Sequence, residues 1–189
     1  MKLKLTVLAM TSLMLIPGSV VNAAEGYFSA KMLLGSKSLD SDWEENDSMD
    51  TIGLQSTYQP ASLPLGIALD FYGNGNEEEI SGHKTETTVG ELNLGLRYSP
   101  IILGGAFSPY LGGGVSYAAA ELEKVRSGVK TKYDDTGIGY WVGGGIEYLF
   151  TERWSIGADI HYSSVDVELN GEKRDAGGLS WAATIGYRF

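Results

Sequence analysis

The last eleven residues of the chain, 179–189, alternate between apolar side chains and polar or small ones. One face of an extended strand through this segment carries Leu179, Trp181, Ala183, Ile185, Tyr187 and Phe189, and the other carries Ser180, Ala182, Thr184, Gly186 and Arg188. The two faces differ because successive side chains of a strand point in opposite directions. An apolar exterior around a small or polar interior is the pattern of a strand whose outer solvent is lipid.

The same alternation recurs seven more times upstream and predicts eight strands. Their approximate ranges are 27–34, 51–58, 65–72, 85–98, 110–120, 137–149, 154 onward and 179–189. The polar face is too rich in glycine, serine and charged residues to form the core of a soluble β-sandwich or a lipocalin-like barrel, which are the alternatives. We therefore predict an all-β fold, an eight-stranded antiparallel up-and-down transmembrane β-barrel.

Long polar segments alternate with short turns between these strands. The expected long loops are 35–49, 73–84, 121–136 and 164–176. Bacterial outer-membrane barrels keep short turns on the periplasmic side and long loops outside, so the asymmetry orients the predicted barrel. Aromatic residues lie at the short-turn ends, where we expect one girdle at the membrane surface: Tyr58, Tyr98, Tyr148, Trp154, Tyr187 and Phe189.

The alternation changes phase within the seventh predicted strand. Its apolar residues are even-numbered up to Tyr162, but after Ser163 and Ser164 they are the odd-numbered Val165, Val167 and Leu169. This shift indicates a β-bulge, or the point at which the strand leaves the membrane.

The first 23 residues have the features of a secretory signal peptide. Lys2 and Lys4 precede an apolar run over 5–16, which Pro17 interrupts, and small residues around Ala23 offer a cleavage site. The run is too short to span a bilayer as a helix, which disfavours a membrane anchor. We assign residues 1–23 to a cleaved signal peptide and residues 24–189 to the barrel.

Charge and composition exclude several kinds of function. The formal net charge is −10, and removal of the signal peptide would take it to about −12, which disfavours nucleic-acid binding. The chain has no cysteine, which excludes disulfides, thiol chemistry and cysteine-ligated metal. The glycine triplets 112–114 and 143–145 lack the residues of a phosphate-binding loop, and the acidic residues do not have EF-hand spacing. We expect no cofactor and no bound metal.

Three features resemble the small eight-stranded outer-membrane proteins of the OmpX/OmpA-barrel and opacity-protein type. They are the signal peptide, the segment Pro109-Tyr110-Leu111-Gly112-Gly113-Gly114-Val115 and the terminal Gly186-Tyr187-Arg188-Phe189. The resemblance implies a bacterial outer-membrane location, contact with lipid and lipopolysaccharide, and recognition of Tyr187 and Phe189 by the barrel-assembly machinery. That family includes adhesins, resistance and structural proteins, and narrow channels, so the fold leaves the activity open.

Eight ionisable side chains fall on the predicted inner face: Lys31, Asp70, Glu91, Arg97, Glu147, Asp159, His161 and Arg188. An eight-stranded barrel is only wide enough for side chains to fill it, so each buried charge needs a partner. We predict a mutually satisfied polar network that plugs the lumen, with Arg97, Glu147 and Arg188 nearest the periplasmic end. A gated channel is the alternative, although the charges and Trp141 would obstruct it.

The sequence His161-Tyr162-Ser163 also resembles the His-x-Ser pair of barrel-borne lipid A deacylases, with Asp175 in place of the acid. Ser164 stands where that family has Asn, and Asp175 where it has Glu. The alternation places His161 inside the barrel, whereas such chemistry must face the acyl chains, so we expect no enzyme.

The acidic residues of 40–50 and 77–79 could bind divalent cations that bridge lipopolysaccharide, or a host ligand, although a solvated loop is the simpler interpretation. We therefore predict a non-enzymatic outer-membrane barrel that acts in envelope integrity or in adhesion and ligand contact through its loops. A narrow channel for small solutes and a lipid A-modifying enzyme are the alternatives.

Overall fold

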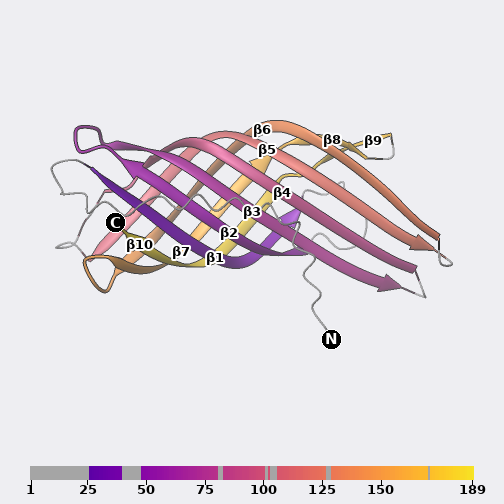
Figure 1. Cartoon of the computed structure of the whole chain (residues 1–189), viewed down its shortest axis with the longest axis horizontal. Coiled ribbons are helices and arrows are strands. Elements are labelled where there is room, and N and C mark those ends of the chain that lie inside the picture. The colour runs from indigo at the N-terminus through magenta and orange to yellow at the C-terminus, as the bar shows by residue number, and fades with distance from the viewer. Residues whose placement is uncertain are drawn as a thin grey trace.

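The chain forms a closed antiparallel barrel of eight strands (Figure 1). The computed structural model describes residues 26–39, 48–80, 83–100, 102, 106–126, 129–169 and 171–189. The barrel strands are β1 (Tyr27–Leu39), β2 (Ser48–Gln59), β3 (Leu65–Ile80), β4 (His83–Tyr98), β5 (Phe107–Arg126), β6 (Val129–Leu149), β7 (Trp154–Ser164) and β10 (Gly178–Arg188). Each strand pairs with its sequence neighbour in the barrel, and β10 closes the ring on β1. This confirms the predicted fold class. The predicted signal peptide lies outside the described residues.

Side-chain direction in the barrel follows the predicted alternation. Met32 is 57% exposed, whereas the adjacent Lys31 is 3% exposed. Outward leucine, isoleucine and aromatic side chains form a continuous apolar belt around the wall, and charged side chains point to the axis. In the described part of the chain, no helix is long and apolar enough to cross a membrane.

Two of the expected loops are in fact strand. The pairing of β3 with β4 continues to Ile80 opposite His83, and that of β5 with β6 continues to Arg126 opposite Val129. The loop predictions for 73–84 and 121–136 were therefore wrong for the described residues, because these strands continue above the belt, where the outward face is mostly polar and the apolar exterior ends. Residues 81–82 and 127–128 lie outside the described residues. Within 35–49, β1 reaches Leu39 and β2 begins at Ser48, and residues 40–47 lie outside the described residues.

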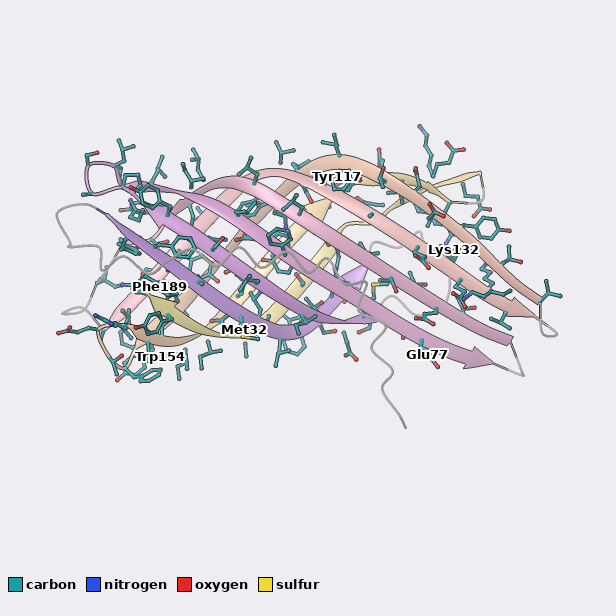
Figure 2. The ribbon with its side chains drawn as sticks, viewed as in Figure 1. Met32, Glu77, Tyr117, Lys132, Trp154 and Phe189 are labelled. Carbon is teal, nitrogen blue, oxygen red and sulfur yellow. The ribbon has the colours of Figure 1, made fainter. Side chains whose placement is uncertain are left out.

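The extension of these four strands is called the external blade here, and it projects beyond the other barrel strands (Figure 1). It begins at the row in which Gly75, Thr88, Glu121 and Asp134 face one another in turn. It comprises residues 75–80, 83–88, 121–126 and 129–134. Figure 2 shows Trp154 and Phe189 towards one end of the molecule, Glu77 and Lys132 towards the other, and Tyr117 between them.

The segment 164–176 contains a small hairpin instead of a loop. Strands β8 (Asp166–Leu169) and β9 (Glu172–Asp175) pair with each other in a separate two-stranded sheet. Of the two interpretations of the phase shift, the bulge was wrong, because the alternation continues unbroken and Ser163, Val165, Val167 and Leu169 are all buried. The other, that the strand leaves the membrane here, agrees with the end of β7 at Ser164 and the start of the separate β8–β9 sheet. What changes at Val165 is the chemistry of the inner face, which turns from polar to apolar where the chain leaves the barrel ladder.

These apolar residues belong to a cluster that we call the apolar cap. It closes the lumen at its external end, and its members come from the hairpin and from inward positions of the surrounding strands: Leu39, Met49, Val89, Ala118, Ala120, Leu122, Val165, Val167, Leu169 and Ala176, with Tyr133 packed against them. Within the belt the inner face is mostly polar, with a small apolar cluster of Leu33, Tyr72 and Ala182, whereas at the external end the inward side chains form a hydrophobic core.

Aromatic residues form the expected girdle at the short-turn end. The Tyr187 ring lies 5.0 Å from Trp154 and 4.9 Å from Phe189, and Phe28 lies 5.7 Å from Phe189. A second group that the sequence analysis missed lies towards the external end, with Tyr140 and Tyr162 6.4 Å apart on neighbouring strands. Aromatic rings at both borders of an apolar belt match the two interfaces of a bilayer.

Candidate functional site

The candidate site is the polar interior of the barrel, which is built in layers from inward positions of six strands. All eight ionisable residues expected there point into the lumen, and seven of them are buried; Arg188, near the periplasmic mouth, is partly buried. They come from β1, β3, β4, β6, β7 and β10. Closure of the sheet brings together residues that are more than one hundred positions apart in the chain.

The layer nearest the periplasm centres on Glu147. The Lys31 ammonium donates to Glu147 Oε1 at 2.6 Å, and the Ser155 hydroxyl donates to Oε2 at 3.1 Å. Arg188 Nη2 lies 3.8 Å from the same carboxylate. Lys31 also lies 3.7 Å from the centre of the Tyr110 ring, so its charge is held by a carboxylate and an aromatic face together.

A second ion pair joins neighbouring strands β3 and β4. Arg97 Nη2 donates to Asp70 Oδ2 at 2.6 Å, and Nη1 donates to the Thr57 hydroxyl at 2.7 Å. The guanidinium carbon lies 5.4 Å from the Tyr110 ring and 5.9 Å from the Trp141 ring. The guanidinium of Arg97 therefore has polar partners on one side of the lumen and aromatic rings on the other.

Asp159, in the middle of the barrel, is held by neutral donors. The Tyr110 hydroxyl donates to its Oδ2, and Gln55 Nε2 donates to the same oxygen at 3.0 Å. Gln55 Nε2 also lies 2.8 Å from the Tyr72 hydroxyl. Hydrogen bonds of this kind stabilise a buried carboxylate without a cation in contact.

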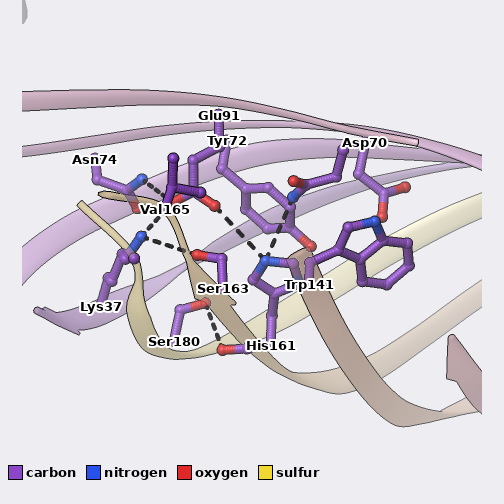
Figure 3. A network of polar contacts seen from close by, with 12 residues as sticks. Lys37, Asp70, Tyr72, Asn74, Glu91, Trp141, His161, Ser163, Val165 and Ser180 are labelled. Atoms are coloured by element: carbon purple, nitrogen blue, oxygen red, sulfur yellow. Dashed lines mark hydrogen bonds and ion pairs between the residues drawn. The ribbon is translucent and has the colours of Figure 1, made fainter. Parts of the chain in front are cut away.

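His161 lies between two aromatic rings (Figure 3). Its ring centre is 4.6 Å from Tyr72 and 5.6 Å from Trp141, and both pairs are stacked. Its Nε2 lies 3.3 Å from Asn93 Nδ2 and 3.7 Å from Glu91 Oε2. The aromatic rings and this amide fill the cross-section of the barrel at this level.

Lys37 is the lumen residue that the sequence analysis missed, because the first strand was expected to end at Leu34. It forms a buried ion pair with Glu91 (Figure 3). It also donates to the carbonyl of Ala176 at 3.1 Å. Lys37 is an even number of residues from Lys31 in β1, so the alternation of side chains along a longer strand would have placed it on the inner face. Asn74 donates to Glu91 at 3.3 Å from the other side. This layer adjoins the apolar cap, because Lys37 and Asn74 donate to the carbonyls of Ala176 and Val89, which belong to the cap.

The lumen charges balance. Its cations are Lys31, Lys37, Arg97 and Arg188, and its anions are Asp70, Glu91, Glu147 and Asp159. Three of these pairs are in direct contact. The remaining two residues are Asp159, in the middle of the barrel, and Arg188, at its periplasmic mouth. A balanced, paired set is what a narrow, poorly solvated interior requires.

The residues of the deacylase-like motif do not come together. Asp175 accepts from the Ser164 hydroxyl at 2.8 Å and from the backbone amides of Val165 and Gly177 at 2.7 Å each. It therefore fixes the base of the β8–β9 hairpin, while His161 lies in the lumen with Asn93 and Glu91. Among the described residues, no group of three or more histidine and carboxylate side chains is placed to hold a metal ion.

The β8–β9 hairpin is also fastened to the blade side of the barrel. The backbone amide of Glu168 donates to Asp135 Oδ2 at 2.6 Å. Amide donors from Glu168 and Thr136 hold the pKa of Asp135 below its ordinary value. Asp135 and Asp175 thus hold the two ends of β8, and with it the apolar side chains that complete the cap.

At the C-terminus, Tyr187 and Phe189 are fixed at the short-turn end of the barrel. The Tyr187 hydroxyl accepts from Arg153 Nη1 at 3.1 Å. The Phe189 amide donates to the Phe28 carbonyl at 2.9 Å, which ties the last residue to the first strand.

Sequence comparison relates the chain to bacterial outer-membrane proteins. A family model described as the outer membrane protein beta-barrel domain matches residues 5–189. A protein of Sinorhizobium fredii, described as the uncharacterized outer-membrane protein y4mB, is 28% identical over 81 residues, which are 43% of this chain and 35% of that protein. The match thus spans about a third of that relative's length.

Several solved structures share the fold at low identity. Neisserial surface protein A has a TM-score of 0.60 and 18% identity, covering 86% of this chain and 95% of that one. Ail of Yersinia pestis, in complex with the heparin analogue sucrose octasulfate, has a TM-score of 0.61 and 17% identity, covering 87% and 99%. OprG of Pseudomonas aeruginosa has a TM-score of 0.61 and 17% identity, covering 88% and 97%. The likeness at these identities is one of fold.

Proposed function

Because the chain belongs to the outer membrane protein beta-barrel domain family, we propose that it is a closed, non-catalytic barrel that acts through the surface it presents outside the cell. The protein lies in the outer membrane, where it contacts lipid and lipopolysaccharide. The proposal concerns what it does there. We favour contact with other molecules at the cell surface over the conduction of small solutes and over lipid A chemistry.

The lumen is closed at two levels, which supports a role at the surface and disfavours conduction. Below, ion pairs and stacked rings fill the barrel, and above them the apolar cap covers the external end. A channel needs a continuous polar path, and ions would have to break three paired contacts and cross a hydrophobic layer. Both features support a closed barrel over the narrow-channel alternative.

The contact surface is the external blade together with the β8–β9 hairpin. On the outward face of the blade, the charged side chains that the structure describes are five carboxylates and two lysines: Glu77, Glu86, Glu121, Glu123, Asp134, Lys130 and Lys132. The hairpin adds a smaller negative charge, because its exposed Asp166, Glu168 and Glu172 are partly offset by the exposed Lys173 and by Arg174, which pairs with Glu172. Complementary charge steers and selects partners, so this surface suits a basic partner.

This expectation differs from the polyanionic ligand in the structure of Ail, which is described in complex with a heparin analogue. The two proteins share the barrel, and the sign of the external charge decides which ligands each one attracts. Sulfated sugars would be repelled by the net negative charge of the blade, where five outward carboxylates outnumber the two lysines that pair with Glu121 and Glu123. We therefore expect a basic protein segment as the ligand class.

Binding of a lysine decapeptide to the protein in lipid nanodiscs tests this function. The wild type is expected to bind it at low ionic strength and to bind sucrose octasulfate weakly. A variant with Glu77→Gln, Glu86→Gln and Glu123→Gln should lose most of the peptide binding. The matched control, Lys130→Gln with Lys132→Gln, should bind the peptide more tightly. Unchanged binding in both variants, or a preference for sucrose octasulfate, contradicts the proposal.

The C-terminal strand carries a second role that we propose, as the recognition signal for the barrel-assembly machinery. The outward ring of Phe189 and the neighbouring Tyr187 support it, because they end the strand that closes the ring. Phe189→Ala with Tyr187→Ala should reduce the folded protein in the outer membrane, whereas Leu179→Ala, at the other end of β10, should not. Equal yields of both variants would contradict this role.

A further inference from the structure

A lysine, a glutamate and an asparagine form a buried cluster next to the apolar cap (Figure 3). They are Lys37 of β1, Glu91 of β4 and Asn74 of β3. A single carboxylate oxygen, Glu91 Oε1, accepts from the Lys37 ammonium and, at 3.3 Å, from Asn74 Nδ2. Two hydrogen bonds of about 3 Å to one oxygen keep the two nitrogens within about 6 Å of each other. Figure 3 shows the Lys37 and Asn74 side chains pointing towards one another beside Glu91.

The hydrogen bonds of the Asn74 amide prepare its carbonyl carbon for attack by a nucleophile. The Thr51 hydroxyl donates to Asn74 Oδ1 at 2.7 Å. Nδ2 donates to the Val89 carbonyl at 3.2 Å as well as to Glu91, and these two acceptors fix which end of the amide faces Glu91. A donor on Oδ1 stabilises the negative charge that develops on this oxygen when a nucleophile adds to Cγ.

The Lys37 amine lies in an environment that disfavours its charge. Besides Glu91, its partners are the Ser163 hydroxyl at 3.4 Å and the carbonyl of Ala176, a residue of the apolar cap, at 3.1 Å. Burial penalises both charges of an ion pair, so a proton can pass from the ammonium to the carboxylate that it contacts. The neutral lysine amine that results is a nucleophile.

We propose that Lys37 and Asn74 join in an intramolecular isopeptide bond, with Glu91 as the proton carrier. The ammonium gives a proton to Glu91, and the neutral Nζ adds to Cγ of Asn74, which places negative charge on Oδ1 beside the Thr51 hydroxyl. Glu91 then protonates Nδ2 and takes a second proton from Nζ while the bond between Cγ and Nδ2 breaks. The products are the new amide, a protonated Glu91 and free ammonia. The reaction changes no net charge and requires no oxidant or other co-reactant.

The bond ties β1 to β3 across β2, which lies between them in the sheet. It closes a covalent loop from residue 37 to residue 74 that contains the whole of β2, and it fastens this part of the wall next to the apolar cap. A covalent closure of this kind lowers the conformational entropy of the unfolded chain, so the linked protein should resist unfolding.

A second buried lysine of β1 provides an internal control. Lys31 also points into the lumen, where it pairs with Glu147. The Ser155 hydroxyl donates to that carboxylate, and a serine offers no amide carbon to a nucleophile. Lys31 should therefore stay unmodified in the same protein.

Trypsin digestion of the purified, denatured protein, followed by mass spectrometry, tests for the bond directly. The sequence has no lysine or arginine between Lys31 and Lys37, or between Lys37 and Lys84. An unlinked chain is cut after each of the three lysines and gives the peptides 32–37 and 38–84. The linked chain is expected to give a single peptide 32–84, because trypsin does not cut after an acylated lysine. Its mass should be lower by that of ammonia, about 17 Da.

Two variants and one side reaction complete the test. Asn74→Ala lacks the acceptor carbon and Glu91→Gln lacks the proton carrier, so both should be cut after Lys37. Attack on Asn74 by the backbone amide of Gly75 also releases ammonia, but it leaves Lys37 free and cleavable. Cleavage of the wild type after Lys37, with or without loss of ammonia, or a linked peptide in Asn74→Ala, would overturn the proposal. Folding of each variant is checked by the heat-dependent gel mobility of the barrel.

Discussion

Lys31 and Glu147 lie 116 positions apart in the chain, yet the Lys31 ammonium is 2.6 Å from a Glu147 carboxylate oxygen inside the barrel. Their strands, β1 and β6, are not neighbours in the sheet. The contact therefore crosses the lumen. It shows that the interior is a packed polar core and that the opposite walls are joined through it.

Breaking this pair should destabilise the barrel. Lys31→Met leaves Glu147 with the Ser155 hydroxyl and the more distant Arg188, and the loss of one partner from a buried pair costs about 3–5 kcal/mol. The free energy of unfolding, measured by urea titration in lipid vesicles, should fall by that amount. Lys31→Met with Glu147→Leu should recover most of it. A double variant as unstable as the single variant would show that the two residues are not coupled.

Gly112 should be sensitive to substitution because Trp141 occupies the space beside it. A Cβ at Gly112 would lie 3.0 Å from the Trp141 ring and 2.9 Å from the Leu96 carbonyl oxygen. Gly112→Val is expected to cost about 1–3 kcal/mol through overpacking and to change the Trp141 fluorescence. The control is Gly90→Val, an exposed position on the outer face where a Cβ would meet nothing within 4 Å. Equal losses of stability in the two variants would contradict an inward position for Trp141.

The hairpin should respond to acid through Asp135. Amide donors depress the pKa of Asp135 below its ordinary value of 3.8. A depressed carboxyl pKa stabilises the fold above the ordinary value, and the contribution is lost as the pH falls through the folded value. The amide resonance of Glu168 should therefore shift with a midpoint below 3.8, measured by NMR. Asp135→Asn should abolish this transition, and its persistence in that variant would rule out Asp135 as the cause.

The tryptophans should report the orientation of the barrel wall. Trp181 is 64% exposed on the outside, whereas Trp141 is 2% exposed in the lumen. In single-tryptophan variants, lipids with brominated acyl chains should quench Trp181 strongly and Trp141 weakly. Trp154, in the periplasmic girdle, should be quenched best by bromine near the headgroups. Strong quenching of Trp141 would mean that the inner and outer faces are reversed.

The barrel could be predicted from sequence because lipid imposes one requirement on every strand. Within the belt, each outward position must be apolar, so Ile185 or Leu94 gives a clear signal with a period of two. Above the belt the outward face meets water, so Glu77 or Lys132 gives no such signal. For this reason the pattern predicts loops where β3 to β6 extend beyond the belt, and it gives no indication of the blade.

The partners within the lumen could not be read from sequence. The alternation placed Lys31, Asp159 and His161 on the inner face, but their contacts depend on the stagger of strands around the ring. The apolar cap was missed for another reason. The apolar Val165 and Leu169 indicate a phase shift in the sequence, because apolar side chains on the inner face are unexpected where most of that face is polar.

The closed lumen is the central claim, and conductance tests it most directly. The purified protein, reconstituted in a planar lipid bilayer in molar potassium chloride, is expected to give no discrete current steps above the lipid alone across the range of applied voltage. A variant that carries Lys37→Ala, Glu91→Ala and Val167→Ser, which removes the external ion pair and part of the apolar cap, should conduct more often than the wild type. Stable, ohmic current steps from the wild type, unchanged in that variant, would contradict the account.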